Sequence, residues 1–269
     1  MAHRFLLYID ILGFSALSKD RDRVKDLHEV VASLNLKAQP DFRAIVVSDT
    51  ILVYNVNEAA ARATPSLYIS YLSGFASELQ VRLLGKDIYF RAVLMLGDFN
   101  HYELNGIPFF DGDALVSAHQ SVKEVKAIGL FIDTALARSS EVFSTEKFND
   151  EFDFVCTAQG LEQVRNVYGG QVPLPRDIVE PADDLLRLSQ DLLYLKGIYE
   201  NIKQSHSFSV KSKFERTWQL FERRYPEVLS ALVASRFDWN AISNGADWIA
   251  QMKLYPESFS SSIETRVDF

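Results

Sequence analysis

The stretch Phe5 to Leu17, FLLYIDILGFSAL, constrains the fold more than any other part of the chain. It begins as an apolar run, which is typical of a strand buried on both faces. One carboxylate, Asp10, interrupts the run, and Gly13 follows three residues later. A buried carboxylate is strongly unfavourable unless it is paired or bound to a metal ion. The chain must therefore either neutralise Asp10 or use it.

A second carboxylate, Asp49, lies at the centre of the segment Arg43 to Tyr54, RAIVVSDTILVY. The β-branched runs on both sides of it predict a hairpin with its turn at the central Ser-Asp pair. Each acid has an ordinary interpretation, because Asp is common in turns and Asp10 could cap a following helix. Together they suggest a site, because the first strand and the hairpin would be neighbours in one sheet with both acids at one edge. Two carboxylates there could hold one or two Mg²⁺ or Mn²⁺ ions, and Gly13 would let backbone N–H groups approach phosphate oxygens.

The rest of the pattern predicts an α/β fold, a mixed sheet flanked by helices, with a helical C-terminal extension. We expect a catalytic domain over residues 1–160 and the extension over residues 161–269. The segment between Asp98 and Phe110 is expected to be a loop. Strands are predicted over Phe5–Ile11, 88–96 and 128–133, and helices over 21–36, 64–85, 113–127, 182–204, 213–225, 227–237 and 240–255.

The bulk composition excludes some classes of protein. A formal net charge of −8 argues against binding a nucleic-acid template or an anionic membrane by bulk charge. The single cysteine, Cys156, allows no intrachain disulfide, which fits a reducing cytosol. No window approaches the roughly 18 to 20 apolar residues that a spanning helix needs, and the N-terminal run is a poor signal peptide. We therefore expect a cytoplasmic protein with no membrane segment.

Four blocks of the sequence resemble the class III nucleotidyl cyclases. YIDILGFS is similar to the first strand of that family, and VVSDTILVY to its second metal-aspartate hairpin, with Ser48 where many members have glycine. FRAVLMLGDF resembles the strand that carries an arginine. FFDGDALVSAHQSVKEVKA followed by IGLFID resembles the helix and strand that close the catalytic fold. The likeness runs from Phe5 to Asp133, about half the chain, with the blocks in matching order and spacing.

The short block GDALVSAH, in a chain without sensor domains, looks like the bacterial pyrimidine cyclases of the Pycsar anti-phage system. Those proteins make cyclic UMP or cyclic CMP, which a separate effector protein reads. Class III sites form between two catalytic domains, so the resemblance also implies a homodimer with active sites at its interface.

The resemblance implies roles for individual residues around the two acids. Asp10, Asp49 and the carbonyl group of Ile11 would bind two Mn²⁺ or Mg²⁺ ions. Arg91 would contact the triphosphate. The backbone N–H groups that would hold the β- and γ-phosphates belong to Leu12, Gly13, Phe14 and Ser15.

Base selection in the family lies at positions that Ile45 and Phe109 occupy here. Purine cyclases often place polar or charged residues there, so the apolar pair argues against the familiar recognition of adenine or guanine. Arg43 and Thr50 flank the same hairpin, where they could present donors to a base or face solvent.

The closing helix departs from the purine-cyclase pattern. Val116 and Gln120 stand where those enzymes carry an Asn and an Arg that steady the ribose and the transition state. Loss of one such donor costs about 3–4 kcal/mol in other enzymes. Lys123 and Lys126 lie further along the helix, on what is expected to be a solvated face. His119 shares the helix, but one histidine without partners is not a site.

The leading hypothesis is a uridylate cyclase that converts UTP to 3′,5′-cyclic UMP and pyrophosphate as a second messenger in antiviral defence. A cytidylate cyclase that makes cyclic CMP from CTP is an open alternative. So is a degenerate cyclase fold that binds a nucleotide without chemistry, which the missing Asn and Arg would explain. The negative net charge disfavours a template-using two-metal enzyme such as a polymerase.

Overall fold

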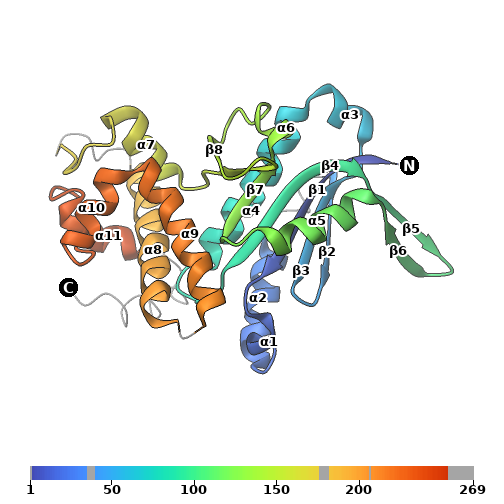
Figure 1. Cartoon of the computed structure of the whole chain (residues 1–269), viewed down its shortest axis with the longest axis horizontal. Coiled ribbons are helices and arrows are strands. Elements are labelled where there is room, and N and C mark those ends of the chain that lie inside the picture. The colour runs from blue at the N-terminus through green and yellow to red at the C-terminus, as the bar shows by residue number, and fades with distance from the viewer. Residues whose placement is uncertain (1, 35–39, 176–181, 206, 254–269) are drawn as a thin grey trace. The chain divides into compact units, whose positions relative to one another are not determined.

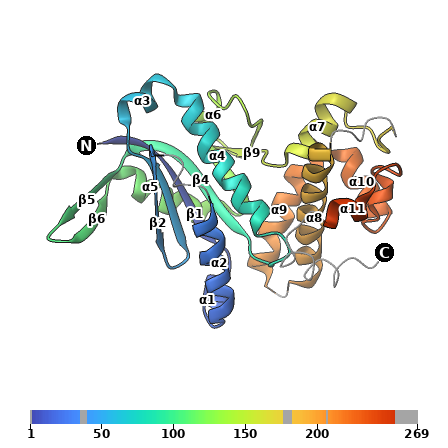
Figure 2. The ribbon, with the colours of Figure 1, turned by 180° about the vertical axis from the view of Figure 1, so that it is seen from behind.

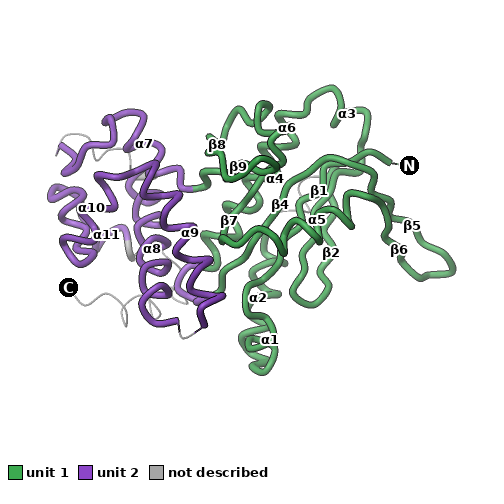
Figure 3. The backbone as a smooth tube through the Cα atoms, viewed as in Figure 1, with its two compact units in different colours: residues 1–83, 88–157 green, residues 84–87, 158–269 purple. Residues whose placement is uncertain are grey.

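A computed structural model describes residues 2–34, 40–175, 182–205 and 207–253 of the chain. The chain forms two compact units, coloured separately in Figure 3. Unit 1 comprises residues 1–83 and 88–157, and unit 2 comprises residues 84–87 and 158–269. Whether a domain boundary lies at residue 160, as the sequence suggests, stays a prediction. No helix in the described ranges combines the length and the apolar character needed to cross a membrane.

Unit 1 is built around a seven-stranded sheet in the order β2-β3-β1-β4-β7-β9-β8. The β4–β7 pair is parallel and the other pairs are antiparallel, so the sheet is mixed. The predicted fold class, a mixed sheet flanked by helices, is confirmed. The elements of unit 1 are β1 (His3–Ile11), α1 (Phe14–Leu17), α2 (Arg21–Ser33), β2 (Phe42–Val47), β3 (Thr50–Asn55), α3 (Glu58–Ala63), α4 (Pro65–Arg82), β4 (Phe90–Asp98), β5 (Asn100–Leu104), β6 (Ile107–Asp111), α5 (Asp113–Glu124), β7 (Gly129–Asp133), α6 (Thr134–Ala137), β8 (Thr145–Lys147) and β9 (Phe152–Val155).

The two faces of the sheet have different coverings. Figures 1 and 2 show α2 and α4 on one side of the sheet and α5 on the other. Side chains alternate along a strand, so Phe5, Leu7 and Ile9 of β1 share the face that packs in the main core with α2 and α4. Tyr8 and Asp10 therefore lie on the opposite face, where α5 contacts β1 and β4. The carboxylate in the apolar run thus points away from the main core.

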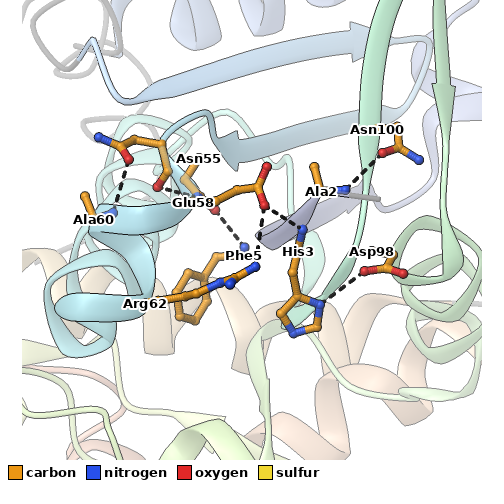
Figure 4. Close-up of polar contacts among 10 residues, drawn as sticks. Ala2, His3, Phe5, Asn55, Glu58, Ala60, Arg62, Asp98 and Asn100 are labelled. Carbon is orange, nitrogen blue, oxygen red and sulfur yellow. Dashed lines mark hydrogen bonds and ion pairs between the residues drawn. The ribbon is translucent and has the colours of Figure 1, made fainter.

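The N-terminal end of β1 is closed by a network of short polar contacts (Figure 4). The Phe5 N–H donates to the buried side-chain oxygen of Asn55 over 2.7 Å. The His3 N–H donates to Glu58 over 3.3 Å, and the His3 ring lies 3.3 Å from an Asp98 oxygen. Glu58 and Asp98 therefore both have protein partners at this end of the strand.

The segment expected to be a loop before Phe110 is instead the hairpin β5–β6, so that prediction is wrong. Its turn contains Asn105 at φ 53° and Gly106 at φ 79°. Asn-Gly is the strongest short-range hairpin signal, because both residues tolerate the left-handed backbone that the tight turn requires. The sequence therefore contained the information needed to find this hairpin.

Unit 2 is helical. Its elements are α7 (Gln159–Tyr168), α8 (Ala182–Gln204), α9 (Phe208–Arg224), α10 (Pro226–Ala234), the 3₁₀ helix η2 (Trp239–Ala241) and α11 (Trp248–Lys253). The prediction of one helix over 240–255 is wrong as far as Lys253, because the Ser243-Asn244-Gly245 segment interrupts it. Residues 254 and 255 lie outside the described residues. So do the last two residues of the helix predicted over 21–36, which ends at Ser33.

Candidate functional site

Two carboxylates meet at the C-terminal end of β1. The strand register pairs Asp10 with Thr50, the residue that follows Asp49. The Ile11 N–H donates to the Asp49 carbonyl oxygen over 2.9 Å, which ties the hairpin turn to the end of β1. The structure therefore places Asp10 and Asp49 at neighbouring positions where β1 ends and β3 begins, which is called the sheet edge below. Their role as metal ligands stays a prediction.

The turn between β2 and β3 explains how Asp49 is presented. Ser48 adopts a φ of 57°, the left-handed region that β-branched and bulky residues avoid. The β-branched runs end at Val47 and resume at Thr50, so only Ser48 and Asp49 form the tip. Asp49 is half-buried there, and its side chain makes no hydrogen bond or ion pair with any residue of the described ranges.

Asp10 is neutralised on one side only. Its Oδ2 accepts hydrogen bonds from Arg91 Nη2 over 2.5 Å and from Arg91 Nε over 3.1 Å. The side chains of Asp10 and Arg91 retain 19% and 12% of their exposure. The Asp10 Oδ1 has no hydrogen-bond partner among the residues that the structure describes. Arg91 therefore fixes the carboxylate and leaves one of its oxygens available to a ligand.

The Gly13 loop lies directly after the acid. Gly13 adopts a φ of 73°, and a side chain there would meet no atom within 4 Å, so the space beside it is open. The N–H groups of Gly13, Phe14 and Ser15 have no acceptor among the described residues, as at the start of any helix. The Leu12 N–H instead donates to the Tyr89 carbonyl oxygen over 2.8 Å. Leu12 is therefore not open to a phosphate in this structure, unlike the other three predicted donors.

The oxygen donors of this site fit a hard divalent cation that takes its remaining ligands from elsewhere. Among the described residues, no three His, Cys, Asp or Glu side chains gather closely enough to hold a metal ion by themselves. Mg²⁺, however, is commonly held by one or two carboxylates together with substrate phosphates and water. Asp10, Asp49 and the Ile11 carbonyl group could supply that protein share.

A polar cluster that sequence reasoning missed lies on the same face of the sheet. The Tyr8 hydroxyl lies 2.9 Å from His119 Nδ1 on α5 and 3.3 Å from Thr50 Oγ1 on β3. Burial raises the pKa of the Tyr8 hydroxyl, and the charges of Asp10 and Asp49 raise it further. The Thr50 hydrogen bond and the Arg91 charge act in the opposite direction on that pKa. The Tyr8 hydroxyl therefore lies within the electrostatic reach of both acids.

The partner of His119 could not be read from the sequence, because Tyr8 and His119 are 111 residues apart. The alternation of side chains along β1 could, however, have shown that Tyr8 belongs to the site. Side chains alternate along a strand, so Tyr8 had to share a face with Asp10.

The predicted base-contacting residues are only partly brought to this site. Ile45 is half-buried and pairs with Leu52, the β3 neighbour of Tyr8, so it shares the face that carries Asp10. Arg43 lies near the start of β2, far from the turn at Ser48 and Asp49. Its guanidinium group donates to the Pro40 and Phe42 carbonyl oxygens over 3.0 and 2.9 Å. Arg43 therefore points its charge at its own strand end, away from the turn.

Three other predicted positions lie on exposed surface. Phe109 is on β6 and stacks on Tyr102 with ring centroids 5.6 Å apart. Val116 on α5 is 57% exposed, and Gln120, one helical turn later, is exposed as well. Among the described residues, no hydrogen bond or ion pair joins the side chains of these three residues to Asp10 or Asp49.

No protein-family model and no curated protein matches this chain. Solved structures similar to it include a bacterial light-regulated adenylyl cyclase, with 12% identity and a TM-score of 0.42 over 62% of this chain and 97% of that chain. The adenylyl cyclase CyaB from P. aeruginosa has 12% identity and a TM-score of 0.38, over 57% and 93% of the two chains. The guanylyl cyclase domain of the RhoGC fusion protein from the fungus Blastocladiella emersonii has 15% identity and a TM-score of 0.41, over 58% and 95%. These scores describe a partial likeness of backbone only.

Proposed function

We propose that this chain is a nucleotidyl cyclase whose metal and triphosphate site is the sheet edge at Asp10 and Asp49. One observation carries the proposal. Asp10 lies near the end of β1 with one oxygen that has no hydrogen-bond partner among the described residues, and Gly13 follows it in an open loop. Asp49 lies in the adjoining hairpin turn, whose carbonyl oxygen accepts from the Ile11 N–H, and its side chain has no partner in the described ranges. Leaving a half-buried carboxylate unpaired costs stability, which is reasonable where a cation is to be bound.

In this proposal each residue of the site binds either a metal ion, the triphosphate or another residue of the site. Asp10 and Asp49, with the Ile11 carbonyl group, would hold up to two Mg²⁺ or Mn²⁺ ions. When bound, such ions lower the pKa of the attacking ribose 3′-hydroxyl group and neutralise the triphosphate and the departing pyrophosphate. Arg91 orients Asp10 through Oδ2, so that Oδ1 faces the ligand. The N–H groups of Gly13, Phe14 and Ser15 would donate to phosphate oxygens.

The finer assignment is a pyrimidine substrate, with UTP converted to cyclic UMP and CTP as the second choice. Its support is the Pycsar-like GDALVSAH block, together with the apolar residues Ile45 and Phe109, which stand where class III purine cyclases often carry polar residues and so argue against familiar purine recognition. The same resemblance supports a homodimer, a separate cyclic-nucleotide effector and a role in antiviral defence.

A second candidate function is nucleotide binding without turnover. It is favoured by Val116 and Gln120, which leave α5 without the Asn and Arg of purine cyclases. A cyclase built this way needs another donor near the transition state, or it is slow.

The test is direct. The purified chain is incubated with ATP, GTP, CTP and UTP in Mn²⁺, and products are identified by mass spectrometry, beside Asp10→Ala and a control, Asp150→Ala. Asp150 is fully exposed in a surface ion pair with Lys147, so its loss should change little. We expect a cyclic pyrimidine product that Asp10→Ala loses and Asp150→Ala keeps.

Other products would decide between the candidates. A cyclic purine product alone would contradict the base assignment but keep the reaction. Nucleotide binding with no cyclic product would favour the second candidate function.

A further inference from the structure

The Tyr8–His119 pair lies on the same face of the sheet as Asp10 and has no role in the proposed function. Tyr8 is 5% exposed, and its hydroxyl group contacts Thr50 as well as His119. His119 belongs to α5, and the residues one helical turn away from it are Leu115, Val116, Val122 and Lys123. The exposed His119 ring lies against the buried Tyr8 ring, with centroids 5.9 Å apart and planes tilted by 57°.

The hydrogen bond to Tyr8 decides which ring nitrogen of His119 is available. Nδ1 lies 2.9 Å from the Tyr8 hydroxyl oxygen. Nε2 is on the far side of the ring from that contact and has no partner among the residues that the structure describes. If the Tyr8 hydroxyl group donates to Nδ1, the proton of the neutral ring is on Nε2, which then becomes a donor. The Thr50 hydroxyl group can donate to the Tyr8 oxygen and favour this arrangement.

The location of the pair links it to the acids. Tyr8 and Asp10 are two residues apart on β1 and so share one face of the sheet. Thr50, the other partner of Tyr8, is paired with Asp10 in the register and follows Asp49 in the chain. A ligand that contacts both Asp10 and Asp49 therefore lies close to the face of the sheet on which Tyr8 contacts His119.

We propose that His119, oriented by Tyr8, donates a hydrogen bond from Nε2 to a ribose or phosphate oxygen of the bound nucleoside triphosphate. This inference rests on the proposed function, because it places the nucleotide at the acid pair. It also names a donor on α5, the helix on which Val116 and Gln120 replace the Asn and Arg of purine cyclases. Tyr8 is a positioning residue, since it acts through the histidine ring.

The competing explanation is structural, in which His119 only satisfies the buried Tyr8 hydroxyl group. Two substitutions separate the explanations. His119→Asn keeps a polar atom near the position of Nδ1, where it can still meet Tyr8, and removes the Nε2 end of the ring. His119→Gln reaches further and carries an amide nitrogen near the position of Nε2. His28→Asn on α2 is the matched control, because His28 is also an exposed helical histidine.

The readout is binding, which does not depend on turnover. Calorimetry in Mn²⁺ measures the Kd of the α,β-methylene analogues of UTP and ATP, which cannot release pyrophosphate. We expect His119→Asn to weaken the better analogue about tenfold or more, the size of a lost hydrogen bond to a charged group. His119→Gln should recover part of that loss, and His28→Asn should bind as the wild type does. Tyr8→Phe should weaken binding less than His119→Asn, because the ring remains but is no longer fixed.

The outcomes separate this inference from the proposed function. Equal affinity of His119→Asn and the wild type would overturn the inference and leave the cyclase proposal intact. Should His119→Asn prove unstable, His119→Gln and His119→Ala are compared, and equal affinities of those two would overturn it. If His119→Asn binds the analogue more weakly and the wild type makes no cyclic product, the inference is supported and the cyclase reaction is contradicted. A wild type that binds neither analogue would overturn both.

Discussion

Two of the arginine–carboxylate pairs, one in each unit, differ in how many of their carboxylate oxygens have partners. In unit 2, Glu162 accepts from Arg224 Nε over 2.5 Å and from Arg224 Nη2 over 2.8 Å, and the Tyr225 hydroxyl group also donates to it. In unit 1, Arg91 donates twice to one oxygen of Asp10, and the other oxygen has no partner among the described residues. Both carboxylate oxygens are therefore used in the first pair, whereas in the second pair one oxygen is left for a ligand.

The difference shows how burial and hydrogen-bond satisfaction separate a structural ion pair from a binding site. The Glu162 and Arg224 side chains are 7% and 9% exposed, and both oxygens of Glu162 accept hydrogen bonds. A buried pair is tolerated only with such satisfaction. The Asp10–Arg91 pair is more exposed and lies beside Asp49, which has no protein partner in the described part of the chain. We therefore expect substitutions in unit 2 to cost stability and substitutions at the sheet edge to cost ligand binding and activity.

The largest expected effect is on activity, in Asp49→Asn. The variant should lose cyclic product by roughly 100-fold or more, because an ion ligand contributes several kcal/mol to the transition state. Its melting temperature should equal or exceed that of the wild type, since a half-buried carboxylate without a partner is removed. Product is measured by mass spectrometry and stability by thermal unfolding, with Asp150→Asn as control. Activity within tenfold of the wild type would contradict the role of Asp49.

The second effect is on stability, in Glu162→Gln. It leaves Arg224 buried without its counter-charge, so the free energy of unfolding should fall by about 3–5 kcal/mol. Urea unfolding measures this, beside Glu78→Gln, which breaks a half-exposed helical pair with Arg82 and should cost less than about 1 kcal/mol. Similar losses in the two variants would remove the contrast between saturated and surface pairs.

A third prediction concerns Arg91, whose loss should affect both the stability of unit 1 and metal binding at Asp10. Arg91→Met leaves Asp10 without its partner and should lower the free energy of unfolding by about 1–3 kcal/mol. Because a cation can then replace the guanidinium charge at Asp10, Mn²⁺ should raise the melting temperature of the variant more than that of the wild type. Equal shifts with Mn²⁺ would indicate that the ion does not reach Asp10.

A further prediction concerns Asp191 of α8 and is a pH dependence of stability. Burial raises the pKa of Asp191 from 3.8 to about 8, against the opposing hydrogen bonds from the Leu161 and Gly160 N–H groups. The nearby Glu162 charge raises this pKa and the Arg187 charge lowers it. The folded state keeps a proton that the unfolded state releases between these pKa values. Stability is therefore fully present below pH 4 and falls as the pH rises toward 8.

Asp191→Asn tests this assignment. The variant keeps an oxygen that can accept from the Leu161 N–H, which lies 3.0 Å from the Asp191 carboxylate. Between pH 5 and 8 its free energy of unfolding should vary less than that of the wild type, by at most about 1.4 kcal/mol per pH unit. Parallel pH profiles would mean that Asp191 is ionised throughout this range.

The sheet edge was predictable from sequence because its information is local. The apolar run around Asp10 and the β-branched runs around Asp49 identify the strand and the hairpin, and alternation fixes which side chains share a face. The β5–β6 hairpin was missed because its Asn-Gly turn was not recognised, although the signal was present.

The remaining features depend on contacts between distant segments. The pairing of Asp10 with Arg91, of Tyr8 with His119, and of Glu162 with Arg224 joins residues that no local pattern connects. Which of two arginine–carboxylate pairs is saturated depends on a third group, such as the Tyr225 hydroxyl group. Such networks are set by tertiary packing, so a single sequence does not reveal them.

The measurement that tests the central claim most directly is Mn²⁺ binding to the acid pair. Electron paramagnetic resonance counts free Mn²⁺ in the presence of α,β-methylene UTP, for the wild type, for Asp10→Asn with Asp49→Asn, and for Glu162→Gln below its melting temperature. We predict that the wild type and Glu162→Gln bind Mn²⁺ with the analogue, and that the double variant binds neither above background. A double variant that binds as many ions as the wild type would contradict the claim that this sheet edge is the metal and nucleotide site.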